Sequence, residues 1–132
     1  MTTTRDAACS CGKLSLTVEG EPIRISMCHC LACQKRTGSA FGIQARFPRE
    51  KVTITGSAKT FVRVGDEGHR ITFSFCPECG ATVYYQFDDV PDFIAVPVGA
   101  FADPTFPPPR IAVYGNRRHA WVTEPDGIEH LD

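Results

Sequence analysis

The seven cysteines of this chain lie in three short clusters, a spacing that is typical of metal sites. The clusters are Cys9-Ser10-Cys11, Cys28-His29-Cys30-Leu31-Ala32-Cys33 and Cys76-Pro77-Glu78-Cys79. Two thiolates one to three residues apart can point at one ion across a tight turn, and sets of thiolates favour zinc. Seven thiols divide into a set of four and a set of three, which predicts up to two zinc ions per chain.

Disulfide bonds are the main competing use of cysteine, and the sequence argues against them. The number of cysteines is odd, and the chain opens on Met1-Thr2-Thr3-Thr4 without an apolar signal segment. We therefore expect a cytoplasmic protein, in a compartment where clustered cysteines more often bind metal or do redox chemistry. An iron–sulfur cluster and dithiol redox chemistry remain as alternatives to zinc.

The first and third clusters together predict a structural zinc site. Cys9 and Cys11 fall on the same face of an extended segment, because side chains alternate along a strand. In the third cluster Pro77 presets a turn and Gly80 permits the positive φ that such a turn needs. Four thiolates would close the coordination shell and join distant parts of the chain, which stabilises the fold. The expected ligands are Cys9, Cys11, Cys76 and Cys79.

The middle cluster predicts a different kind of site, because only three thiolates arrive, from Cys28, Cys30 and Cys33. Three protein ligands leave a fourth position to water or substrate, as in catalytic zinc sites. His29 alternates with the ligands and should point away, as a pocket or core residue. The alternatives are a second structural zinc, closed by a distant ligand such as His69 or His119, and reduced thiols without a metal.

Basic and small polar residues follow the middle cluster directly. A site with three thiolates is itself negative, so an anionic substrate would need compensating positive charge and hydrogen-bond donors nearby. Lys35 and Arg36 could neutralise a carboxylate and Ser39 could bind the substrate, with surface charge and a turn hydroxyl as the alternative reading. Phe41 and Trp121 are candidate pocket residues, with core packing as the alternative.

The elements that must position these residues are mostly strands. Apolar and polar residues alternate in segments 14–19, 52–55, 61–64 and 71–75, and further β-rich segments lie at 23–27, 40–47, 81–87 and 93–98. Glycine and proline separate them at short intervals. The one predicted helical turn covers residues 31–37 and begins inside the second cysteine cluster. We therefore expect a mostly antiparallel β fold.

Length and charge narrow the functional class. The chain of 132 residues has no internal linker, so residues 1–132 are expected to form one domain. Its formal net charge is −1, so the chain has neither the overall positive charge nor the basic tail that would favour nucleic acid as a partner. No apolar run is long enough to cross a bilayer, so no membrane partner is expected.

The run from Cys28 to Phe41, preceded by Cys-x-Cys-Gly and followed by Phe-Cys-Pro-x-Cys-Gly, closely resembles one known family. It is similar to the glutathione-dependent formaldehyde-activating enzymes and the related centromere-protein-V domain, from Cys9 to the segment after Trp121. The resemblance implies a β-tent of stacked antiparallel sheets with a structural zinc on the first and third clusters. It also implies a second zinc on Cys28, Cys30 and Cys33.

The activity implied by this resemblance is condensation of formaldehyde with glutathione to S-hydroxymethylglutathione, formally a carbon–sulfur lyase reaction. A thiol substrate would bind at the second zinc as a thiolate and attack or release a small carbonyl carbon. The chain is shorter than the founding enzymes of the family, so the resemblance defines the fold better than it defines which thiol is the substrate. Two other classes of function are a zinc-stapled protein-interaction module without catalysis and a metal-free redox sensor.

Overall fold

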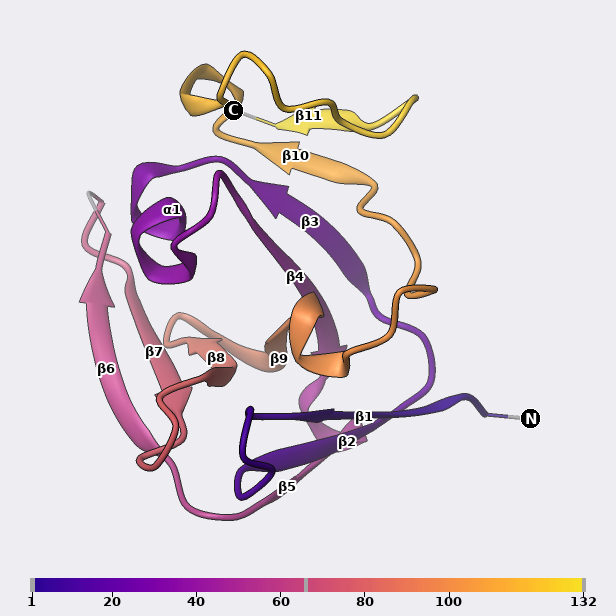
Figure 1. Ribbon diagram of the computed structural model, residues 1–132, viewed down its shortest axis with the longest axis vertical. Helices are drawn as coiled ribbons and strands as arrows, with labels where there is room; N and C mark the ends of the chain where they lie inside the picture. Colours follow the sequence, from indigo (N-terminus) through magenta and orange to yellow (C-terminus); the bar gives the residue numbers. More distant parts are fainter. Residues whose placement is uncertain (1, 66, 132) are drawn as a thin grey trace.

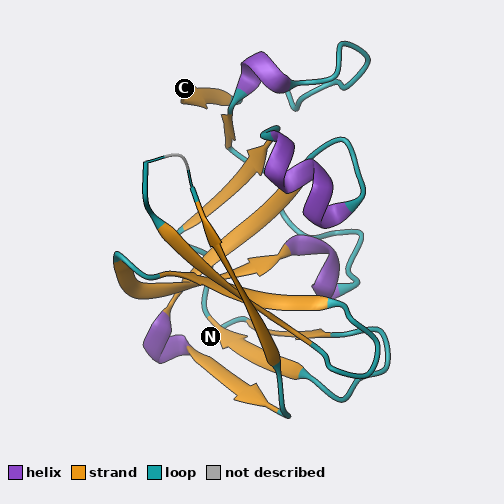
Figure 2. Ribbon diagram, turned by 90° about the vertical axis from the view of Figure 1, so that its left-hand side faces the viewer, coloured by secondary structure: helices purple, strands orange, loops and turns teal. Residues whose placement is uncertain are grey.

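A computed structural model describes residues 2–65 and 67–131, and it confirms the mostly β fold expected from the sequence. Strands form two sheets, and the helical segments are short (Figure 2). The described residues include no helix long and apolar enough to span a membrane.

The smaller sheet is antiparallel and has the order β1-β2-β5, with bounds Thr4–Ala8, Ser15–Glu19 and Val52–Thr55. The tight connection from β1 to β2 holds Cys9 and Cys11. Register follows the alternation in the sequence, since Leu16 pairs with Ala7 on one side and Ile54 on the other. Leu16 and Val18 are buried, whereas their neighbours on the opposite face are more exposed.

The larger sheet has eight strands in the order β11-β10-β3-β4-β9-β8-β7-β6. In chain order their bounds are Arg24–Cys28 (β3), Gly42–Pro48 (β4), Lys59–Val64 (β6), Arg70–Phe75 (β7), Thr82–Phe87 (β8), Val90–Pro97 (β9), Ile111–Val113 (β10) and Glu129–Leu131 (β11). The pairs from β3 to β6 are antiparallel, as expected. The short β10 is parallel to both β3 and β11, and the sequence did not predict these two strands.

The main core lies between one face of the large sheet and the small sheet. Leu14, Leu16 and Val18 from the β1–β2 unit pack with Phe47 of β4 and Val96 of β9, and all of them are almost completely buried. The opposite face of the large sheet holds a second, aromatic cluster: Ile71, Phe73, Tyr85, Phe87, Phe93 and Ala95. The large sheet therefore packs a cluster of buried side chains on each of its two faces.

The only α-helix of the described chain, α1 (Leu31–Thr37), lies on the aromatic side. The large sheet curls so that β6 and β7 stand across from β3 and β4, with α1 between them (Figure 1). Gly38 ends the helix in the left-handed region, at φ 66°, and its N–H bonds back to the Gln34 carbonyl. The described residues also include the short 3₁₀ helices Arg49–Lys51 (η1), Val98–Phe101 (η2) and Gly115–Arg117 (η3).

Candidate metal centres

The first and third cysteine clusters come together although they are far apart in the chain. The sulfurs of Cys9, Cys11, Cys76 and Cys79 all lie within 4.8 Å of one another. Cys9 and Cys11 extend from the β1–β2 connection, and Cys76 and Cys79 lie in the turn between β7 and β8. The group therefore joins the small sheet to the large one.

The spacing of these sulfurs fits a tetrahedral zinc ion. The Cys11 sulfur lies 3.6 Å from the Cys9 sulfur and 3.6 Å from the Cys76 sulfur. Zinc–sulfur bonds of about 2.3 Å place the corners of a tetrahedron about 3.8 Å apart, whereas a disulfide needs about 2.05 Å. All seven cysteines are free of disulfide bonds. This group could therefore hold a metal ion with little rearrangement.

Backbone amides already point at the sulfurs of this group. The Leu14 N–H donates to Cys9 Sγ and the Glu78 N–H donates to Cys76 Sγ, each at 3.3 Å. Hydrogen bonds from the backbone N–H groups of Ala81 and Cys11 lower the pKa of Cys79 to about 6. Such N–H donors stabilise thiolates and orient them as ligands.

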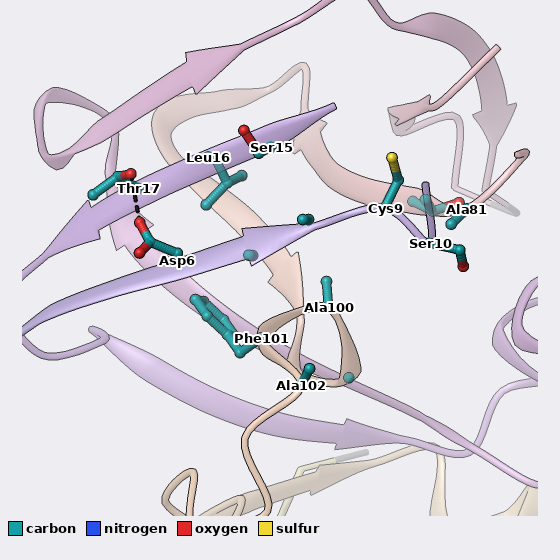
Figure 3. Close-up of a pocket in the computed structure, with 14 residues that line it drawn as sticks. Asp6, Cys9, Ser10, Ser15, Leu16, Thr17, Ala81, Ala100, Phe101 and Ala102 are labelled. Carbon is teal, nitrogen blue, oxygen red and sulfur yellow. Dashed lines mark hydrogen bonds between the residues drawn. The ribbon is translucent and has the colours of Figure 1, made fainter. Parts of the chain in front are cut away.

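A cavity of about 590 Å³ lies beside this group, between the β1–β2 unit and the turn at residues 99–102 (Figure 3). Most of the described residues that line it are small, and Asp6 is the only charged residue among them. The Asp6 carboxylate accepts a hydrogen bond from the Thr17 hydroxyl at 2.7 Å. An anionic substrate would therefore meet no positive charge on the described lining of this cavity.

The second group consists of Cys28, Cys30 and Cys33, whose sulfurs also lie within 4.8 Å of one another. Cys28 ends β3, and Cys30 is the N-cap of α1, where its sulfur accepts the Cys33 N–H at 3.3 Å. One turn of helix thus brings Cys33 back to the other two. Among the described residues neither His69 nor His119 joins this group.

The three thiols strongly perturb one another. Hydrogen bonds with the Cys28 side chain, and to a smaller extent with that of Cys33, hold the pKa of Cys30 far below its usual range. The positive charge of Arg63 acts in the same direction. The same contacts with Cys30 and Cys33, together with burial, raise the pKa of Cys28. One thiolate therefore forms readily, and a cation is needed before all three sulfurs can ionise in so small a space. This donor set fits a soft divalent metal such as zinc.

His29 points away from the sulfurs, as its position in the sequence indicates. Its side chain is completely buried, and Nε2 lies 2.8 Å from the Glu124 carboxylate. Glu124 also contacts His130 Nε2 at 2.8 Å, which ties the C-terminal strand β11 to the segment holding the cysteines. Hydrogen bonds from His130 and His29 lower the pKa of Glu124. His29 is therefore a core residue.

Comparison with known proteins identifies the family of this chain. The family model of the glutathione-dependent formaldehyde-activating enzyme matches residues 4–117, which include all seven cysteines. The chain belongs to this family. The match ends before the C-terminal residues that hold His29.

A curated protein from Fusarium vanettenii, provisionally named as a glutathione-dependent formaldehyde-activating enzyme, is 30% identical over 80 residues. The match covers 61% of this chain but only 42% of the Fusarium protein, so this family member corresponds to less than half of that relative. The crystal structure of a Rhodobacter sphaeroides protein has a TM-score of 0.57 at 20% identity, covering 78% of this chain and 91% of the other. At this identity the similarity shows a shared fold.

The three residues proposed from sequence to contact substrate lie on two sides of α1 in this family member. Arg36 is half-buried and points to the aromatic cluster, with its guanidinium carbon 5.0 Å from the Tyr85 ring centroid. Lys35 and Ser39 are exposed and line a hollow of about 580 Å³ on the other side.

The two candidate pocket residues also differ. Phe41 packs on the cluster around Met27 and meets the His29 ring edge-on at 6.0 Å. Trp121 is 73% exposed and lines the same hollow as Lys35, so core packing does not explain it. His119 lies at this hollow too, but its Nε2 contacts Gln34 Oε1 at 2.8 Å.

Sequence reasoning missed two residues that position the second group. Gln34 donates to the His29 carbonyl at 2.9 Å and to the Arg117 carbonyl at 3.2 Å, linking α1 to η3. Glu124 fixes His29 from a loop 95 residues away. The position of Gln34 in the helix marks it as a candidate, but no local pattern points to Glu124.

Proposed function

We propose that this protein is a zinc-dependent carbon–sulfur lyase that acts on an adduct of glutathione with formaldehyde. Zinc on Cys9, Cys11, Cys76 and Cys79 is structural, and zinc on Cys28, Cys30 and Cys33 serves catalysis. The observation that supports this most directly is the convergence of only three thiols, in a family member whose family name specifies glutathione and formaldehyde. The reducing cytoplasm is the expected location.

Cys28, Cys30 and Cys33 would hold the zinc ion, which would lower the pKa of a substrate thiol and so supply a thiolate nucleophile at neutral pH. In the synthetic direction the substrate sulfur forms a bond to the carbonyl carbon of formaldehyde, and the carbonyl oxygen takes up a proton. The reverse reaction breaks the carbon–sulfur bond and returns the proton. No oxidant or second cofactor is needed for this balance.

The residues of the chain bind and orient the thiol. Cys28, Cys30 and Cys33 are held by the end of β3 and the first turn of α1, and their spacing is fixed by backbone geometry. Arg36 extends from the same helix to the aromatic face and offers charge to a carboxylate. Lys35 and Ser39 offer similar groups on the outer side of α1. Alanine variants of the three residues will tell which side of α1 meets the substrate.

A protein-interaction module is the second candidate, and the hollow beside α1 favours it. Leu31 is 56% exposed and Trp121 is 73% exposed, and both line this hollow. Large exposed aromatic residues are enriched at protein interfaces. The module predicts binding of a macromolecule without any response to small thiols.

Cobalt substitution tests the proposed function. Addition of glutathione to the cobalt protein should change the sulfur-to-cobalt charge-transfer spectrum, and S-methylglutathione should not, because its sulfur cannot become a thiolate. The zinc protein should accelerate formation or breakdown of S-hydroxymethylglutathione, and Cys33→Ser should abolish both effects. A cobalt spectrum that ignores glutathione at millimolar concentration would contradict the proposal and favour the module.

A further inference from the structure

The face of the large sheet that holds Cys28 also holds a row of polar side chains. Arg24, Ser26 and Cys28 alternate along β3, so their side chains leave the same face. Their partners on β4 are Arg46, Gln44 and Gly42, in that order. Directly opposite residues of an antiparallel pair share a face. The second cysteine group therefore lies at one end of a row whose other end is a pair of arginines.

The pairing of Arg24 with Arg46 is unfavourable without an anion. Like charges directly opposite each other on two strands repel. Both side chains are half-buried, and burial lowers the pKa of Arg46, with the charge of Arg24 acting in the same direction. Among residues 2–65 and 67–131, the arginines that pair with carboxylates are Arg5 and Arg70. No acidic side chain of the described structure therefore neutralises this pair.

Two further arginines approach the same face and share its aromatic cluster. Arg46 lies 4.5 Å from the Phe93 ring centroid, and Arg36 lies 5.2 Å from that of Phe73. The guanidinium carbon of Arg63 lies 4.9 Å from the centroid of the same Phe73 ring. Four half-buried guanidinium groups thus surround one curved surface. Aromatic rings hold each of these three by cation–π contact, and Arg46 Nε also donates to Gln44 Oε1 at 3.2 Å. The Nη groups of Arg46 form the edge of this guanidinium that could meet an anion.

Buried polar atoms without partners gather on this face. Among the described residues these atoms are Arg24 Nε, Ser26 Oγ, Arg36 Nε and His29 Nδ1. Three of the four belong to this row of side chains or to the helix above it. Ser26 is only 1% exposed. A buried donor without an acceptor costs free energy, so this concentration of donors indicates a ligand with several acceptor oxygens.

We propose that this face binds a carboxylate of the thiol substrate, held by Arg24, Arg46 and Arg36 with Ser26 as an additional donor. The inference rests on the proposed function and specifies its substrate class. Arg24 and Cys28 are four residues apart on one strand, which separates their Cα atoms by about 13 Å. A peptide-sized thiol, whose carboxylate lies several bonds from its sulfur, spans that separation once the arginine side chain has extended toward it. Glutathione has this form, and a two-carbon thiol does not.

The test compares two thiols on the cobalt protein, glutathione and 2-mercaptoethanol, which has no carboxylate. Arg46→Gln and Arg24→Gln should each weaken glutathione binding at least tenfold, equivalent to about 1.4 kcal/mol. Neither should change the binding of 2-mercaptoethanol. Arg49→Gln removes the same charge from an exposed residue of η1 and should leave both affinities unchanged.

Thermal melts separate binding from a merely structural role. Arg24→Gln relieves the repulsion from Arg46, so the variant without thiol should melt at the same temperature as the wild type or higher. A destabilised Arg24→Gln variant with unchanged glutathione affinity would overturn the inference. Equal loss of affinity for both thiols would overturn it as well. If no thiol changes the cobalt spectrum of the wild type, the proposed function fails, and this inference fails with it.

Discussion

Replacement of Cys76 by Ser should destabilise the whole fold, whereas replacement of Cys30 by Ser should not. Cys76 is completely buried, and its sulfur lies 3.6 Å from that of Cys11, which is 65 residues away in sequence. Metal held there joins the small sheet to the large one. The second group lies within the six residues from Cys28 to Cys33 and joins only the end of β3 to α1.

The magnitude follows from linkage. A ligand present at a thousand times its dissociation constant stabilises the native state by about 4 kcal/mol. A domain of this size has a total stability of about 5–15 kcal/mol, so a contribution of about 4 kcal/mol is a large part of the total. With about 3 °C for each kcal/mol, Cys76→Ser should lower Tm by about 12 °C or prevent folding. Cys30→Ser should lower Tm by only a few degrees, because serine can still cap α1 and only the link between β3 and α1 loses a metal ligand.

Thermal melts of both variants, with zinc and after chelation, measure these differences. Wild-type protein stripped of all metal should have a Tm close to that of Cys76→Ser. Mild chelation that removes only one zinc should leave a Tm close to that of Cys30→Ser. Equal destabilisation by the two substitutions would refute the reasoning. It would mean that the middle group is structural as well.

Two further predictions concern positions away from the sulfurs. A Cβ on Gly56 would lie 2.0 Å from the Lys13 carbonyl oxygen, at a φ of +102°, so Gly56→Ala should cost about 3 kcal/mol or more in a urea melt; a loss below 1 kcal/mol would contradict this close approach. Glu124 has a lowered pKa, so its contacts with His130 and His29 stabilise the fold above the carboxyl's unfolded value near 4.3 and are lost as pH falls through the lower folded value. Glu124→Gln should remove that part of the acid dependence, and an unchanged acid-unfolding profile would show that the contacts contribute nothing.

Local patterns in the sequence predict much of this structure. The helix at residues 31–37 matches the predicted helical turn, because Cys30 caps it and Gly38 ends it. The alternation in the segment of Phe73 predicts β7 to within one residue. The two cysteine groups were also predicted as sets, because strand period and turn geometry determine which sulfurs can converge.

Features that depend on the pairing of distant strands could not be predicted. The strand β10 has only three residues, and its parallel pairing with β3 leaves no local signature. The neighbours of Arg46 are set by a register that brings Arg24 opposite it and Ala95 on its other side. In the sequence Arg24 and Arg46 are two isolated charges. Only the register makes them a pair that lacks an acidic partner.

The same short helix connects the second cysteine group to the arginine face. A helix of seven residues is marginal by itself, so α1 depends on its cap and its packing. The cap is the Cys30 sulfur, which accepts the Cys33 N–H at 3.3 Å. Arg36 lies one turn further on, and its Nη2 is 3.2 Å from where a Cβ on Gly42 would be. Metal binding that fixes Cys30 and Cys33 therefore also fixes the position of Arg36. Glycine at position 42, opposite Cys28, leaves the room that both arrangements need.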